Sequence, residues 1–97
     1  MSEQDVFDAL KYRIEVDTRG TRRYRNAMGQ LHRIGGPAIE YTNGSKEWLQ
    51  NGQRHRIDGP AIEWCNGVRF WYINGKRLTN AAFNQAVTTC AVVSHNM

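Results

Sequence analysis

Two histidines at equivalent positions are the residues best suited to chemistry. His32 and His55 are each followed by an arginine, and His55 has an acidic residue, Asp58, three positions later. A histidine with a carboxylate partner can act as a general base, so a small enzyme using His55 and Asp58 is one hypothesis. A catalytic centre needs one such constellation, whereas a feature repeated at a fixed interval is typical of a structural role. We therefore expect the histidines to shape the fold, and we expect the protein not to be an enzyme.

An arginine-rich stretch at residues 18–25 is the second candidate for chemistry. It places four arginines around Tyr24, namely Arg19, Arg22, Arg23 and Arg25. Arginines can grip phosphates while a tyrosine ring stacks on a base, as happens when single strands are bound. An acidic protein surface would suit the same charges equally well, and a short charge run is often merely solvated. We expect this stretch to bind a partner, with the choice between protein and nucleic acid left open.

The remaining reactive residue types indicate neither a metal nor a cofactor. Cys65 and Cys90 form no Cys-x-x-Cys pair and have no histidine at metal-ligand spacing. We expect both thiols to be reduced and to lie in the core. Gly36-Pro37 and Gly59-Pro60 are turn residues, because no glycine-rich run leads into a helix as in a phosphate-binding loop.

These residues belong to a repeat with a period of 23 residues. The segment His-Arg-Ile-Gly-Gly-Pro-Ala-Ile-Glu-Tyr at 32–41 recurs at 55–64 with eight of ten positions identical. The same interval relates three further pairs: Asn43-Gly44 and Asn66-Gly67, Trp48 and Trp71, Asn51-Gly52 and Asn74-Gly75. A degenerate copy precedes these two and a truncated copy follows them. Atypical end copies are typical of the caps of a stacked array.

Each copy predicts a β-hairpin. Asn-Gly favours a two-residue type I′ turn, which joins antiparallel strands. The expected strands are 38–42 with 45–49, and 61–65 with 68–73. In this register Ile39 faces Trp48 and Tyr41 faces Lys46, while Ile62 faces Trp71 and Trp64 faces Arg69.

The tryptophans of these strands are expected to lie mainly in the core. Trp is rarely buried completely and is enriched in binding sites, so one of the three is a candidate contact residue. An exposed aromatic patch flanked by Lys46 and Arg69 would then form a contact surface on one face of the sheet.

Helices are expected at both ends of the hairpins. Thr79 as N-cap, with Phe83, Val87 and Cys90 on one apolar stripe, predicts a helix over 79–95 that lies on Phe70 and Tyr72. A capping box near the start predicts a short helix over 1–11. The fold class is therefore β-rich α+β, an antiparallel meander of about six strands, with hairpin repeats at 12–78 in a single domain spanning 1–97.

Composition favours a folded protein with acidic partners. The chain has 97 residues, 40% of them hydrophobic, and a formal net charge of +4. Seven of its thirteen lysines and arginines fall between residues 11 and 33, so the charge is concentrated in the N-terminal half. Residues 1–10 contain no apolar run, and no segment has the length of a membrane span, so a cytoplasmic protein without a secretory signal is expected.

The repeat also resembles known families. The 23-residue period and the Trp-x-x-Asn-Gly-x-x-His stretch at 48–55 are similar to the MORN repeat over roughly residues 14 to 78, although Lys46 and Arg56 stand where MORN repeats usually carry glycine. The His-Arg-x-x-Gly-Pro-Ala variant more closely resembles short repeat proteins of tailed bacteriophages and some bacteria. MORN-like proteins make protein–protein contacts and sometimes bind acidic lipids, and their repeats are not catalytic.

That resemblance implies a phage accessory protein acting in the host cytoplasm as an inhibitor of a host defence complex, for example CRISPR-Cas. The expected partner is the acidic surface of a host protein or nucleoprotein, direct nucleic-acid binding is the alternative, and a homo-oligomer is compatible with the sequence. The residues expected to bind the partner are cations and aromatics of the repeats and of the basic stretch: Arg19, Arg22, Arg23, Tyr24, Arg25, Arg33, Lys46, Trp48, Arg56 and Arg69.

Overall fold

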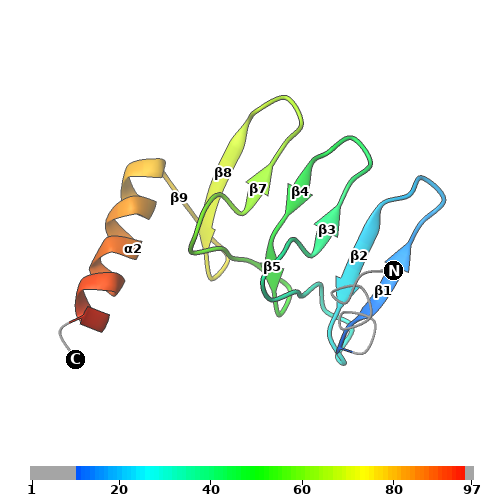
Figure 1. The fold of residues 1–97 in the computed structure, drawn as a ribbon, viewed down its shortest axis with the longest axis horizontal. Helices are drawn as coiled ribbons and strands as arrows, with labels where there is room; N and C mark the ends of the chain where they lie inside the picture. The colour runs from blue at the N-terminus through cyan, green and yellow to red at the C-terminus, as the bar shows by residue number, and fades with distance from the viewer. Residues whose placement is uncertain (1–10, 96–97) are drawn as a thin grey trace.

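The computed structural model describes residues 11–95, with the side chains of residues 11–87 (Figure 1). The helix predicted over 1–11 lies outside these residues apart from its last position. The elements are β1 (Arg13–Val16), β2 (Arg22–Arg25), β3 (Ile39–Glu40), β4 (Lys46–Glu47), β5 (Leu49–Gln50), β6 (Gln53–Arg54), β7 (Ile62–Glu63), β8 (Arg69–Ile73), β9 (Lys76–Leu78) and α2 (Asn80–His95).

The strands form an antiparallel array with the helix at one end (Figure 1). A seven-stranded sheet has the order β1-β2-β3-β4-β7-β8-β9, and β5 pairs with β6 in a separate two-stranded sheet. Helix α2 contacts β8 and β9. The β-rich class, the antiparallel sheet and the C-terminal helix are thus confirmed. In the described part of the chain, no helix combines the length and apolarity that crossing a membrane requires.

The turn at Asn43-Gly44 is not the two-residue turn that the sequence predicted. The Tyr41 amide donates to the Ser45 carbonyl at 3.0 Å, so three residues separate the paired positions. Gly44 has φ of +91°, whereas Asn43 stays in the ordinary region and its Oδ1 accepts a bond from the Ser45 amide. A three-residue loop of this kind combines a type I turn with a left-handed residue that only glycine adopts easily.

The two-residue turns lie instead at the second Asn-Gly pair of each copy. Asn51 and Gly52 have φ of 50° and 82°, and Asn74 and Gly75 have φ of 49° and 82°. Two consecutive residues with positive φ define the type I′ turn. These turns join β5 to β6 and β8 to β9. The same dipeptide therefore forms two different turns within one repeat.

The longer turn shifts the predicted register by one residue. Ile39 pairs with Glu47 and not with Trp48, and Ile62 pairs with Phe70 and not with Trp71. Because a shift of one residue moves every side chain of a strand to the opposite face, the predicted Ile–Trp and aromatic–cation pairs are wrong.

Two faces of the sheet follow from this register, since cross-strand partners share a face and neighbours along a strand alternate. We call one the Arg22 face, which carries Arg22, Glu40, Lys46, Glu63 and Arg69 on five adjacent strands. We call the other the Ile39 face, which carries Arg23, Ile39, Glu47, Ile62 and Phe70.

The core lies against the Ile39 face. Ile39 and Leu49 are buried, and Tyr41 packs against them. Glu47, buried beside Ile39, accepts bonds from the Tyr41 hydroxyl and from Arg54 Nε, the latter at 3.1 Å. Burial first and the Glu47 carboxylate second raise the pKa of Tyr41 to about 12.

Tryptophans and a cysteine depart from the expected core. Trp48 and Trp71 are half-buried, and Trp64 is 36% exposed. Cys65 is exposed because it lies in the three-residue turn that follows Trp64, and not in a strand as predicted. The side chain of Cys90 is outside the described residues.

The start of α2 agrees with the sequence. Thr79 Oγ1 accepts a bond from the Ala82 amide at 3.1 Å, which confirms the predicted N-cap. Phe83, one turn later, is 4% exposed. Its burial attaches the helix to the β8–β9 end of the sheet.

Candidate partner-binding face

The repeat histidines each hold a type I′ turn. His32 Nδ1 accepts the Asn51 amide at 2.9 Å, and His55 Nδ1 accepts the Asn74 amide at 3.0 Å. Burial first and the nearby Lys11 second lower the pKa of His32, which favours the neutral ring that this acceptor role requires.

The hypothetical pair of His55 and Asp58 is engaged elsewhere on both sides. Asp58 accepts from Arg56 Nε at 2.8 Å, while the Nδ1 atom of His55 is occupied by the backbone of the next turn. Over the described residues, no group of three His, Cys, Asp or Glu side chains is arranged to hold a metal ion.

The repeat arginines stack on aromatic rings that precede them in the chain, Tyr24 in β2 and Trp48 between β4 and β5. The Arg33 guanidinium carbon lies 3.9 Å from the centre of the Tyr24 ring, and that of Arg56 lies 3.8 Å from Trp48. Arg56 also donates to the Pro60 carbonyl at 3.0 Å and to Glu63 at 2.8 Å. Stacking combined with directed hydrogen bonds is the geometry that a guanidinium favours.

The glycine before each proline makes room for this arginine. A Cβ atom added at Gly59 would lie 2.9 Å from the Arg56 guanidinium carbon, and one at Gly36 would lie 3.0 Å from that of Arg33. The His-Arg-x-x-Gly-Pro signature therefore describes one packed corner, which forms twice.

Two arginines of the hairpin β1–β2 form ion pairs with carboxylates of the same hairpin. Arg23 bonds Asp17 at 2.9 Å, and Arg25 bonds Glu15. These hydrogen bonds are the largest influence lowering the pKa of each carboxyl. Arg23 and Arg25 belong to the Ile39 face, while Arg19 is exposed in the connecting turn.

Tyr24 in the same hairpin is only 2% exposed, and its hydroxyl donates to Glu40 at 3.1 Å. The ring is covered by Arg33 and meets Tyr12 edge-on. Tyr24 therefore cannot stack on a base as the sequence suggested, and it serves as packing beneath the corner.

Most of the predicted residues come together on the Arg22 face. Arg33 lies on this face because it stacks on Tyr24 and forms an ion pair with Glu40. Trp48 lies there beneath Arg56, which bonds Glu63. Seven of the ten predicted residues share it: Arg22, Tyr24, Arg33, Lys46, Trp48, Arg56 and Arg69. Along the row defined above, positive and negative side chains alternate from strand to strand.

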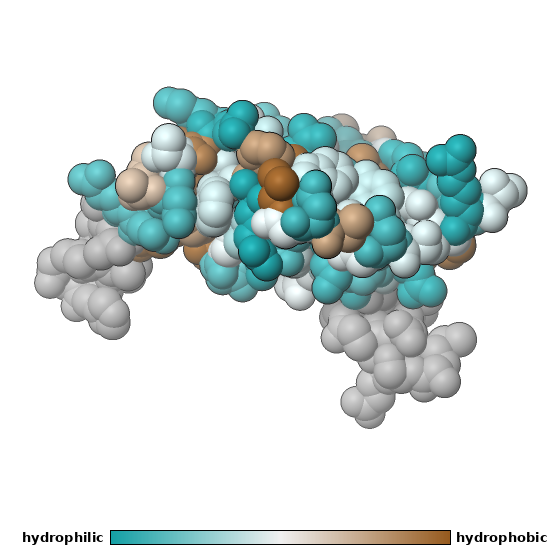
Figure 2. Space-filling view, turned by 90° about the horizontal axis from the view of Figure 1, so that it is seen from above, coloured by the Kyte–Doolittle hydropathy of each residue, from teal (hydrophilic) through white to brown (hydrophobic). Residues whose placement is uncertain are grey.

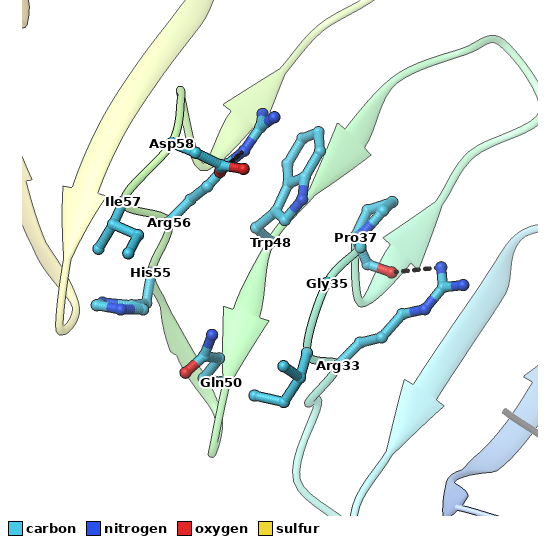
Figure 3. A pocket seen from close by; sticks show the side chains of 11 residues that line it. Arg33, Gly35, Pro37, Trp48, Gln50, His55, Arg56, Ile57 and Asp58 are labelled. Carbon is cyan, nitrogen blue, oxygen red and sulfur yellow. Dashed lines mark hydrogen bonds and ion pairs between the residues drawn. The ribbon is translucent and has the colours of Figure 1, made fainter. Parts of the chain in front are cut away.

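A groove of about 630 Å³ opens between the two corners (Figure 3). The segments 33–37 and 55–58 form the two sides of the groove, and Trp48 lies between them. Ile34 and Ile57 line it and are 51% and 64% exposed. On the side of the hairpin tips, seen in Figure 2, hydrophilic side chains predominate and hydrophobic ones occur in small groups.

Ile34 and Ile57 were not among the site residues predicted from the sequence. The available signal was the repetition of the same apolar residue in a turn segment, where no strand alternation calls for it. Exposed apolar residues that recur beside a tryptophan make the groove a candidate contact surface.

Comparison of the chain with protein-family models, with curated proteins and with solved structures finds no match. The Arg22 face and its groove are therefore the features from which a function is inferred.

Proposed function

We propose that this protein is a non-catalytic binding protein whose Arg22 face covers the surface of a partner protein or nucleoprotein complex. The resemblance of its repeat to MORN-like phage proteins supports a host defence complex, such as CRISPR-Cas, as the class of partner, and the host cytoplasm as the place of action. In this proposal the repeats supply the surface and no catalytic step.

The groove is the observation that carries the proposal. It combines a half-buried tryptophan with two exposed isoleucines, Ile34 and Ile57, and charged side chains surround it. An apolar centre with an aromatic anchor and a polar rim is typical of protein–protein interfaces.

The charge pattern favours a protein surface over a nucleic acid. Arg23, Arg25 and Arg56 are each bound to a carboxylate of this chain, and Glu40 and Glu63 interrupt the cations of the Arg22 face. A phosphate backbone is uniformly negative and rewards uninterrupted positive charge, whereas an alternating row matches a partner with its own alternating charges.

Two triple variants of equal charge test the face. The first, Arg22→Ala with Lys46→Ala and Arg69→Ala, removes three cations from the Arg22 face. The control, Arg13→Ala with Arg23→Ala and Arg77→Ala, removes three cations from the Ile39 face. Each immobilised protein is used to capture partners from bacterial extract, with and without nuclease, after circular dichroism has shown that it is folded.

We expect the first variant to lose the captured partner and the control to keep it, with no effect of nuclease. Equal capture by both variants would exclude the Arg22 face as the binding surface. Capture of nucleic acid without an accompanying protein would support the nucleic-acid alternative in its place.

A substitution in the groove gives an independent measurement. Ile57→Asp changes a side chain that is 64% exposed, so the fold should tolerate it. We expect capture to fall as it does for the first triple variant, because the charge would replace apolar contact at the centre of the interface. Full capture by Ile57→Asp would place the interface away from the groove.

A further inference from the structure

The row of charges on the Arg22 face is complementary to itself. Glu40, Lys46, Glu63 and Arg69 follow one another on β3, β4, β7 and β8, and each is the direct cross-strand neighbour of the next. The signs therefore alternate at the strand spacing of about 4.8 Å. Such a row meets a second copy favourably when the order of the strands in that copy is reversed, because every negative position then lies opposite a positive one.

A two-fold axis parallel to the strands, midway between β4 and β7, produces that reversed arrangement. It places Lys46 opposite Glu63 of a second copy, and Glu40 opposite Arg69 of that copy. Each pairing occurs twice by symmetry, and every one joins opposite charges, which is the requirement of an isologous interface. The bond that Glu63 already accepts from Arg56 leaves further acceptor positions on its carboxylate.

The same axis brings apolar groups together. It exchanges β4 with β7, so the corner that leads into β7 is carried over the groove beside Trp48 of the second copy. Ile57 projects from this corner and is 64% exposed. Exposed ion pairs contribute little on their own, so the burial of Ile57 in a groove of about 630 Å³ supplies the main favourable contact.

We propose that the Arg22 face packs against the same face of a second copy, giving a two-fold symmetric dimer. The dimer does not depend on the partner complex proposed above. The two occupants use one surface and exclude each other, so dilution of the protein favours partner capture.

Sedimentation equilibrium of the full chain, from micromolar to millimolar concentration, tests this dimer. We expect a reversible monomer–dimer equilibrium that weakens as salt is raised. Lys46→Glu alone and Glu63→Lys alone each create two like-charge contacts per dimer, and each should weaken dimerisation by at least about tenfold.

Mixing the two variants is the decisive measurement. Lys46→Glu in one chain meets Glu63→Lys in the other with opposite charges again, so a heterodimer should form at least about tenfold more tightly than either homodimer. Lys46 and Glu63 are also neighbours within one chain, but neither variant regains that internal pair on mixing. Recovery therefore reports the contact between copies.

Ile57→Asp is the second variant, because its exposed position should leave folding unaffected if either charge reversal impairs it. It should weaken the dimer at least about tenfold by placing a charge in the groove. The proposal is overturned if the wild-type protein is monomeric throughout, if Ile57→Asp dimerises like the wild type, or if the mixture of charge variants associates no better than its components.

Discussion

At the scale of single residues, Arg56 connects Trp48 to the Gly-Pro corner and to β7 of the next hairpin. Its guanidinium lies on Trp48, donates to the Pro60 carbonyl and bonds Glu63. A Cβ at Gly59 would intrude on this group at 2.9 Å, although the backbone angle at Gly59 is not one that excludes other residues. An alanine at this position would therefore displace the Arg56 guanidinium, whereas the backbone of the turn would accept it.

A double-mutant cycle can check this dependence. Gly59→Ala should lower the free energy of unfolding by about 1–2 kcal/mol, because the guanidinium must leave Trp48 and Glu63. In an Arg56→Ala background the same glycine substitution should cost little, since nothing then occupies the space. Urea unfolding of the four proteins measures the difference, and additive effects would show that Gly59 has another role.

The pH dependence of stability should show the role of His32. Burial and Lys11 lower its pKa from the ordinary 6.5, and its Nδ1 must stay unprotonated to accept the Asn51 amide. The unfolded chain therefore binds the proton more readily, so this contribution is complete above pH 6.5 and is lost as the pH falls through the folded-state pKa.

Replacing His32 with Gln should flatten that decline, because the amide does not titrate. The measurement is the free energy of unfolding from urea titrations in buffers between neutral pH and the range where carboxylates protonate. An identical decline in the variant would assign the effect to other groups.

At the scale of elements, the two Asn-Gly turns of a repeat place different demands on asparagine. Asn51 has φ of +50°, a conformation that glycine adopts with less strain than asparagine. Asn43 has ordinary φ, and its Oδ1 accepts the Ser45 amide at 2.9 Å. The three-residue turn that contains Asn43 sets the register between β3 and β4.

Glycine substitutions should separate the two turns. Asn51→Gly is expected to leave the free energy of unfolding within about 0.5 kcal/mol of the wild type, since relief of strain offsets the added chain entropy. Asn43→Gly should cost about 1 kcal/mol, because it removes a hydrogen bond and adds the same entropy. Equal effects in urea unfolding would mean that both positions form the same turn in solution.

At the scale of the whole molecule, internal ion pairs weaken the attraction that the positive charge exerts on an anionic partner. The net charge is +4, yet Glu15 and Asp17 hold the guanidiniums of Arg25 and Arg23. A phosphate backbone must compete with these carboxylates for both side chains. We therefore expect the hairpin to bind nucleic acid more weakly than its number of arginines alone predicts.

Freeing these arginines should increase nucleic-acid binding. Glu15→Gln with Asp17→Asn removes both competing charges, and we expect tighter binding to a labelled single-stranded oligonucleotide, with a salt slope steeper by up to about 1.4 for two added phosphate contacts. Asp58→Asn is the control, because Arg56 stays on Trp48 and Glu63. Tight, strongly salt-dependent binding by the wild-type protein would favour the nucleic-acid alternative.

The sequence by itself determined the local design of the repeat. Asn-Gly, Gly-Pro and Thr79 specify turns, corners and a helix start through short-range backbone chemistry, so hairpins and a C-terminal helix were predictable. The structural role expected for His32 and His55 followed from their recurrence, and their bonds to Asn51 and Asn74 agree with it.

Only the tertiary structure decided the register and therefore the faces. The three-residue turn that ends at Gly44 and the two-residue turn that ends at Gly52 contain the same dipeptide, Asn-Gly, and the choice between them depends on packing across strands. The burial of Tyr24 and the pairing of Arg23 with Asp17 likewise depend on neighbours brought close by folding. The groove beside Trp48 exists only where two corners lie side by side, because it is a property of adjacent repeats and not of any one segment.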